Sequence, residues 1–124
     1  MWAQESDNTV KIAGEVYTKT LENCYDRYKI YPTSNMYNFL KLDTKTGQVY
    51  RIQWAIEDNK RYETNVSNKY LVAYDDAQVN GRFELYATEN IYNFILLDKF
   101  SGKAWQIQWG FEIENNVIVP ISSY

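Results

Sequence analysis

The side chains of this sequence that could do chemistry are carboxylates, amides and a single cysteine, because the chain contains no histidine. The Ser-His-Asp and Cys-His catalytic arrangements and the usual zinc and haem ligands are therefore excluded. Cys24 has no second cysteine with which to form an internal disulfide and no histidine to activate its thiol. We interpret Cys24 as a small, half-buried side chain.

Carboxylates could support glycoside hydrolysis, which needs two acids in one cleft. Glu57 and Glu112 recur at predicted strand ends, and Asp75 and Asp76 fall in a predicted loop. No spacing selects a close pair, and Asp75-Asp76 alone lacks the spaced oxygen ligands of a calcium-binding loop. We therefore predict no catalytic residue, no metal ligand and no cofactor, and we keep a carboxylate-dependent hydrolase as the least favoured hypothesis.

Amide and guanidinium side chains form the best candidate for a ligand site. Arg51 and Gln53 alternate with large apolar residues, and Gln106 and Gln108 stand at the same positions 55 residues later. These side chains can offer hydrogen-bond donors and acceptors to hydroxyl-rich ligands. The alternative is a solvated sheet face, or amides that satisfy one another across strands.

The spacing of 55 residues belongs to an internal duplication. Residues 27–57 align without a gap with residues 82–112, and 14 of 31 positions are identical. A repeat of this length is one supersecondary unit used twice. The units run over about 10–66 and 67–124, and no Pro/Gly/Ser-rich linker separates them. We therefore predict a single fused domain over residues 1–124.

Alternation with a period of two residues predicts β-strands in each unit. The clearest strands follow a hairpin turn and carry a large apolar face opposite a small or polar face. The predicted inward residues of these strands are Tyr50, Ile52, Trp54 and Ile56, then Trp105, Ile107, Trp109 and Phe111.

Further strands are predicted on either side of these. They cover 27–31 and 82–86, with Tyr28/Ile30 and Phe83/Leu85 pointing inward, and 37–43 and 92–98. Residues 93–97 are apolar on both faces, so this strand is predicted to be covered on both sides. Weaker strands are expected at 10–19, 62–66, 70–74 and 117–121, and a helical turn at 19–26.

Repeated residues are assigned to turns and to the core. Asp43, Gly47, Asp98 and Gly102 suit hairpin turns, because Asp caps a turn and Gly accepts a positive φ. The predicted core of the repeat is aromatic: Tyr37, Phe39, Trp54, Tyr92, Phe94, Trp105 and Trp109. The alternative role for such aromatics is a stacking platform for sugar or base rings. Asn38 and Asn93 stand in mid-strand, where we expect a buried hydrogen bond to the backbone.

The predicted fold class is all-β. Two tandem antiparallel units would pack as one pseudo-twofold barrel or sandwich. The alternative is a pair of propeller-like blades that close by dimerisation, because propellers need about four blades or more.

The stretch from Arg82 to Asp98, with Gly102 and residues 105–109, resembles a group of small two-repeat bacterial proteins without a characterised function, some of which look exported. The resemblance covers most of the chain and implies a duplicated β fold, but no activity or site. The first unit departs from this pattern at Tyr50 and Arg51. The hairpin pattern Leu-Asp-x-x-[Thr/Ser]-Gly-x-x-[Tyr/Trp] also resembles the inner hairpin of a blade in quinoprotein-type β-propellers.

The net charge and the hydropathy of the chain limit the classes of binding partner that we expect. A net charge of −3 argues against nucleic acid, and no apolar stretch approaches the ~20 residues of a membrane-spanning helix. The start Trp2-Ala3-Gln4 fits both a signal-peptide remnant and an ordinary cytoplasmic start, so both locations stay open. The leading hypothesis is a non-enzymatic binding or protein-interaction module for a glycan or a protein, and the second is a structural or assembly subunit.

Overall fold

The alternating stretches form antiparallel strands in a computed structural model, which describes residues 25–123. Each unit contributes four strands and one short 3-10 helix. The first unit contains β1 (Tyr28–Pro32), β2 (Asn38–Asp43), β3 (Val49–Gln53), η1 (Asp58–Lys60) and β4 (Tyr62–Ser67). The second contains β5 (Phe83–Ala87), β6 (Asn93–Asp98), β7 (Ala104–Gln108), η2 (Ile113–Asn115) and β8 (Val117–Pro120).

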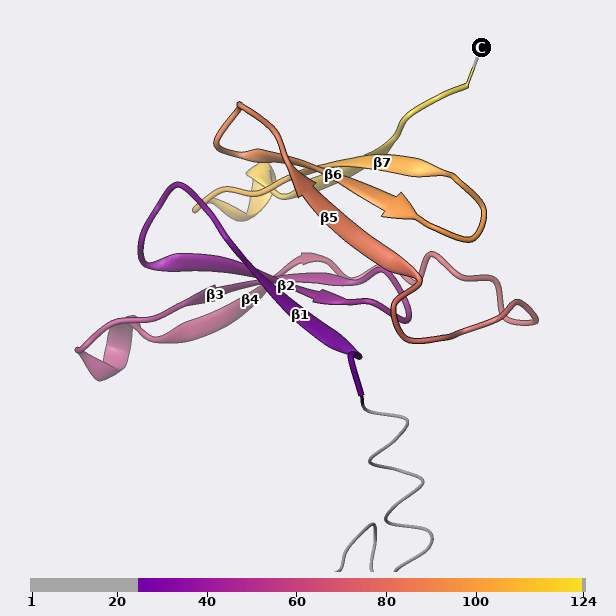
Figure 1. The fold of residues 1–124 in the computed structure, drawn as a ribbon. Coiled ribbons are helices and arrows are strands. Elements are labelled where there is room, and N and C mark those ends of the chain that lie inside the picture. The colour runs from indigo at the N-terminus through magenta and orange to yellow at the C-terminus, as the bar shows by residue number, and fades with distance from the viewer. Residues whose placement is uncertain (1–24, 124) are drawn as a thin grey trace, which may run out of the picture.

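The strands form two four-stranded sheets, in the orders β1-β2-β3-β4 and β5-β6-β7-β8. Every neighbouring pair is antiparallel. Figure 1 shows the sheets stacked as two layers, with the segment from β4 to β5 looping around one end. The all-β prediction and the two-unit sandwich are confirmed, and no closed barrel forms within the described residues.

Most predicted strands correspond to observed ones, but residues 70–74 do not form a strand. They belong to the connection between the sheets. The Leu71 N–H donates to the Thr46 carbonyl at 2.8 Å, and Val72 is buried in the core cluster. This apolar run therefore closes one end of the core as a loop. The predicted strand at 10–19, most of 19–26, Cys24 and Trp2-Ala3-Gln4 lie outside the described residues.

The two sheets meet through faces that are not equivalent in the repeat. The first sheet buries the side of its strands that carries Leu40, Leu42 and Val49. In the second sheet this side faces outward, and Ile95, the counterpart of Leu40, is 38% exposed. The second sheet buries the opposite side: Phe83, Leu85, Phe94, Leu96 and Ile107. The predicted pseudo-twofold relation would bury equivalent faces, whereas the units here stack in a repeated orientation and bury opposite faces.

This arrangement corrects the predicted faces of the first unit. Phe83 and Leu85 point inward as predicted, but Tyr28 and Ile30 are 52% and 60% exposed. The same reversal affects β3, where Val49 and Arg51 are buried and Tyr50 and Ile52 lie on the outer face. The reason is that one sheet packs on only one side of its neighbour, whereas β1, β2, β5 and β6 carry apolar side chains on both faces. For the same reason, β6 is not covered on both sides.

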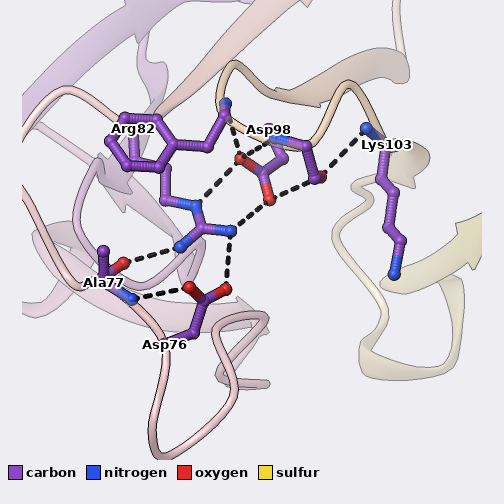
Figure 2. A network of polar contacts seen from close by, with 7 residues as sticks. Asp76, Ala77, Arg82, Asp98 and Lys103 are labelled. Atoms are coloured by element: carbon purple, nitrogen blue, oxygen red, sulfur yellow. Dashed lines mark hydrogen bonds and ion pairs between the residues drawn. The ribbon is translucent and has the colours of Figure 1, made fainter.

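An arginine at the start of β5 ties the connection to the second sheet. The Arg82 guanidinium is buried and donates to both Asp98 oxygens at 2.9 Å. It also donates to the Ala77 carbonyl at 2.6 Å and to Asp76 at 3.1 Å (Figure 2). Because Asp76 and Ala77 precede β5 and Asp98 ends β6, these bonds fix the entry of the chain into the second sheet.

The carboxylate of Asp98 is held ionised by this network. Burial opposes ionisation, but hydrogen bonds from Arg82, from the Ser101 hydroxyl and from the N–H groups of Phe100 and Ser101 lower the pKa of Asp98 to about 2. The first unit has a related pair, in which Arg27 donates to both oxygens of Asp43 at 3.2 and 3.0 Å. The side chain of Arg27 is 30% exposed, against 4% for Arg82, so the second pair is the more deeply buried.

Candidate functional site

Each unit carries a cleft at the same place, formed by the turn after its first strand and the segment after its third strand. The cleft volumes are about 440 Å³ in the first unit and about 530 Å³ in the second. Nine lining positions are equivalent in the repeat, and six of the nine are identical. The first cleft is lined by Asn35, Tyr37, Asn38, Gln53, Trp54, Ala55, Ile56, Glu57 and Lys60, together with Phe111 of the second unit. The second is lined by Asn90, Tyr92, Asn93, Gln108, Trp109, Gly110, Phe111, Glu112 and Asn115.

A repeated Thr-x-Asn-x-x-Asn turn shapes one wall of each cleft. In the first unit, the Thr33 hydroxyl lies 2.7 Å from the Asn38 carbonyl and accepts the Asn35 N–H at 3.1 Å. The Asn35 side-chain oxygen accepts the Tyr37 N–H at 2.9 Å and the Asn38 amide at 3.0 Å. The same bonds recur in the second unit, from Thr88, Asn90, Tyr92 and Asn93. Short polar side chains that bond to nearby backbone stabilise such turns.

The asparagines therefore play a structural role, with partners that differ from those predicted. Asn38 is buried, and its oxygen accepts a hydrogen bond from Arg51 instead of a backbone group. In the second unit, the oxygen of Asn93 accepts the Gln106 amide at 2.7 Å. The partners of these two asparagine oxygens are thus side chains on the neighbouring strand.

The glutamines predicted to bind ligand stand at the rim of the clefts. Gln53 and Gln108 donate through their amide nitrogens to the carbonyls of Lys60 and Asn115, at 2.9 and 3.1 Å. These bonds hold η1 and η2 against the third strand of each sheet. The amide oxygen of Gln108 has no partner within residues 25–123, so it is available as an acceptor.

Arg51 and Gln106 do not join these glutamines in one surface row. Arg51 is only 2% exposed and lies between the sheets, with its guanidinium 5.2 Å from the ring centroids of both Tyr62 and Phe111. It donates to the Tyr62 hydroxyl at 3.0 Å, and its Nε has no hydrogen-bond partner. Gln106 is exposed on the outer face of the second sheet. The separation follows from the burial of opposite faces in the two units.

The aromatic residues predicted to form the core divide into two groups. Phe94 and Trp109 are buried, and Trp105 packs on the core with its ring 6.3 Å from that of Phe83. The prediction is wrong for Tyr37, Trp54 and Tyr92, which are more than 40% exposed, and Phe39 is only half-buried on the outer face. These tyrosines and Trp54 line the clefts because they leave the sheets at the strand ends.

In each cleft a tyrosine ring pairs with a tryptophan ring. The centroids of Tyr37 and Trp54 are 5.1 Å apart, and those of Tyr92 and Trp109 are 5.3 Å apart. Each indole N–H donates to a turn carbonyl, that of Met36 at 2.8 Å and that of Ile91 at 3.2 Å. These bonds fix the ring positions, so the two clefts have a common framework.

The two clefts differ in the solvent exposure of their tryptophan side chains. Trp54 is 42% exposed, whereas Trp109 is 1% exposed. Phe111 packs edge-on against Trp109 with centroids 5.5 Å apart. Its counterpart in the first unit, Ile56, is 88% exposed. The first cleft therefore offers the larger aromatic surface.

The predicted turn residues lie away from the clefts, in the hairpins between β2 and β3 and between β6 and β7. Asp43 accepts the Lys45 N–H at 3.0 Å, and Asp98 accepts the Phe100 N–H at 2.9 Å. Gly47 and Gly102 have φ of +88° and +79°, which favours glycine at these positions.

One carboxylate lines each cleft among the described residues. Glu57 lines the first and pairs with Lys60 at 3.0 Å, and Glu112 lines the second. Within residues 25–123, no group of three or more cysteine, aspartate or glutamate side chains is placed to hold a metal ion. No helix in this part of the chain is long and apolar enough to cross a membrane.

Comparisons with protein-family models, with curated proteins and with solved structures find no match.

The sequence pattern predicts turns at Thr33-Ser34-Asn35 and Thr88-Glu89-Asn90, and both turns are observed. Two features of the clefts are not predicted. The first is that these turns form one wall of each cleft. The second is that Phe111 lines both clefts. No sequence pattern reports that second role, because it depends on how the two units stack.

Proposed function

We propose that this protein is a non-enzymatic binding module whose two equivalent clefts take a glycan. The observation that carries the proposal is the recurrence of one cleft lining, with a tyrosine–tryptophan pair, amides and one carboxylate, in both units. A solvated surface would not require the same set of large aromatic and amide side chains twice.

The lining suits a ring with hydroxyl groups on its edge. The exposed parts of the Tyr37 and Trp54 rings can pack against the apolar face of a pyranose, because aromatic rings bury large areas at low conformational cost. The amide of Gln53 and the carboxylate of Glu57 stand beside these rings and can bond to hydroxyls. In the second unit, Tyr92, Gln108 and Glu112 supply the same groups.

The first cleft should be the stronger site. Trp54 is 42% exposed in this cleft, whereas Trp109 is 1% exposed and packs against Phe111. The first cleft is also lined by Lys60, where the second cleft has Asn115. We therefore expect two affinities, with the tighter one in the first unit.

Binding without hydrolysis is supported by the number of acids. Glycoside hydrolysis by paired carboxylates places two acids about 5–10 Å apart in one cleft. Each cleft here has one acid among its lining residues, and in the first cleft this acid is paired with a lysine.

The proposal is tested by titrating the full chain with a panel of mono- and oligosaccharides. Intrinsic tryptophan fluorescence reports mainly on Trp54 in the first cleft, because Trp109 in the second cleft is buried, and calorimetry gives the number of sites. Tyr37→Ala should weaken the tighter site by about 10-fold or more, and Tyr92→Ala the weaker site, because each removes one wall of a cleft.

Tyr74→Ala is the matched control, since Tyr74 is fully exposed and lines neither cleft. It should bind as the unaltered chain does. If no saccharide in the panel changes either the fluorescence or the heat, the glycan assignment fails. A recovered protein ligand that Tyr37→Ala still binds would place the interaction elsewhere on the surface.

A further inference from the structure

The outer faces of the two sheets are repeat copies of the two faces that pair inside the chain. The outer face of the first sheet carries Tyr28, Ile30, Phe39 and Ile52, whose counterparts Phe83, Leu85, Phe94 and Ile107 form the inner face of the second sheet. The outer face of the second sheet carries Tyr86, Ile95 and Leu97, whose counterparts Tyr31, Leu40 and Leu42 form the inner face of the first. Each exposed face thus resembles one half of an interface that already exists, although the ion pair of Lys41 and Glu63 on the first sheet stands where Leu96 and Ile118 stand on the second.

We infer that copies of this chain pair head to tail, with the outer face of the first sheet of one copy on the outer face of the second sheet of the next. The interface inside the chain is heterologous, because it joins two different faces. If the same interface forms between copies, a second-sheet face of one copy again packs on a first-sheet face of the next. The occupant of each exposed face is therefore a second copy of this chain.

The composition of the two exposed faces supports this occupant. Ile30 is 60% exposed, Ile95 is 38% exposed and Val119 is 48% exposed, and all three stand within strands. Apolar side chains that recur along exposed strand faces mark an interaction surface. On the outer face of the first sheet, the charge of Lys41 is neutralised by Glu63, with 3.0 Å between the Lys41 Nζ and a Glu63 carboxylate oxygen.

Two polar contacts of the interface inside the chain could also form between copies, because the exposed faces carry the equivalent donor and acceptor groups. Inside the chain, the Leu85 N–H donates to the Tyr31 hydroxyl at 3.3 Å. The counterparts are Ile30 on β1 and the exposed Tyr86 on β5, so the Tyr86 hydroxyl of one copy can accept the Ile30 N–H of the next. Lys29 and Glu84, which stand at equivalent positions, pair at 3.9 Å inside the chain, and the same opposite charges would meet between copies.

The assembly also explains an asymmetry of the clefts. Phe111 of the second unit reaches across the interface and lines the first cleft. The side chain of its counterpart, Ile56, is 88% exposed and is not among the residues that line the second cleft of the same chain. In the head-to-tail arrangement, Ile56 of a neighbouring copy would line the second cleft, which is therefore incomplete in a single copy.

Head-to-tail pairing closes into a ring when the rotation per unit returns to the start. Stacked four-stranded units close into rings of about four to eight blades. With two units in each chain, the expected product is a closed ring of about two to four copies.

The experiment measures the mass of the full chain in solution by sedimentation velocity and native mass spectrometry over a wide concentration range. The unaltered chain should form one discrete assembly. Ile30→Lys and Ile95→Lys each place a charge on one outer face and should raise its dissociation constant by about 100-fold or more, because an unpaired charge is buried on pairing. Val79→Lys is the matched control, since Val79 is 41% exposed in the connection between the sheets; it should assemble normally.

Mixing the two variants separates head-to-tail pairing from a twofold dimer. Ile30→Lys keeps an intact second face and Ile95→Lys keeps an intact first face, so each alone should be monomeric and the mixture should form a 1:1 dimer and nothing larger. Circular dichroism of each variant confirms that it is folded, as expected for substitutions at exposed sites.

The inference is overturned if the unaltered chain stays monomeric at the highest concentration. It is equally overturned if either lysine variant dimerises alone, which would indicate a twofold interface, or if the chain forms open filaments. Glycan binding is not required for any of these outcomes, so the assembly and the proposed function can fail separately.

Discussion

The first and second units of this protein are built from one repeat, yet each buries the face that the other leaves exposed. At equivalent positions, Leu40 is fully buried and Ile95 faces outward, whereas Leu85 is buried and Ile30 faces outward. The difference teaches that duplication need not produce a symmetric molecule. A repeat with two apolar faces can stack on a copy of itself in one orientation, which leaves one unmatched face at each end.

The two units also differ in their arginine–aspartate pairs, and substitutions in these pairs should have the largest effect on the free energy of unfolding. Arg82→Met leaves the buried carboxylate of Asp98 without its partner, so we expect the free energy of unfolding to fall by about 3–5 kcal/mol. Arg27→Met removes an arginine whose side chain is 30% exposed, so water can reach the carboxylate of Asp43 and the cost should be smaller, about 1.5–3 kcal/mol. Urea unfolding followed by tryptophan fluorescence measures both. Equal losses would mean that the two pairs are buried to the same degree in solution.

The second prediction addresses the buried and exposed faces directly. Leu85→Ala removes a core side chain that is 2% exposed and should cost about 2–5 kcal/mol. Ile30→Ala, at the equivalent position of the first unit, should cost about 0.5 kcal/mol or less in dilute protein, since it acts on the surface. Chemical unfolding at several protein concentrations provides the measurement. A large loss for Ile30→Ala in the dilute monomer would contradict the assignment of faces.

The third prediction concerns acid stability. Because the pKa of Asp98 is lowered to about 2 in the folded protein, its ionised form stabilises the fold above its ordinary pKa near 4. This contribution, about 2 kcal/mol, is lost as the pH falls from about 4 to about 2. Unfolding curves across this range should therefore show a steep decline.

The matched variant for this decline is Arg82→Met, in which the main donor to Asp98 is absent. Its stability should fall less steeply between about pH 4 and pH 2 than that of the unaltered chain. The pKa values of Asp76 and Glu84 are also lowered, by hydrogen bonds from the Ala77 N–H and from Lys99 respectively. They add to the same decline, so some slope should remain. An unchanged slope in Arg82→Met would contradict the role of Arg82.

The smallest effect is expected where the two units are alike. Thr33→Val and Thr88→Val each remove a hydroxyl that bonds within the Thr-x-Asn-x-x-Asn turn. Each substitution should cost about 1 kcal/mol, and slightly more for Thr33, which is half-buried while Thr88 is exposed. Thermal and urea unfolding of the two variants side by side gives the comparison. A strong effect in only one unit would indicate that the turns are not equivalent.

Much of the fold could be predicted from local pattern. Alternation and the duplicated turn residues indicated the hairpins that became β2-β3 and β6-β7, because side-chain period and turn chemistry act over a few residues. The strand predicted at 70–74 was wrong, because a loop whose apolar side chains close the core can have the same composition as a strand.

The candidate site was harder to predict. Gln53 and Gln108 line the clefts, but Arg51 is buried between the sheets and Gln106 lies on an outer face. Positions 51 and 106 are equivalent in the repeat, so no local rule could separate them. Their separation is a consequence of which sheet packs on which.

The sequence by itself determined that this chain is a duplicated, antiparallel β structure without histidine chemistry, because those properties depend on composition, period and turn residues. The tertiary structure decided which face of each sheet is buried, how far Trp54 and Trp109 are exposed, and that Phe111 of one unit lines the cleft of the other. The physical reason is that both faces of each sheet carry apolar side chains that can be buried. The choice between them is made only when a second sheet covers one and leaves the other free.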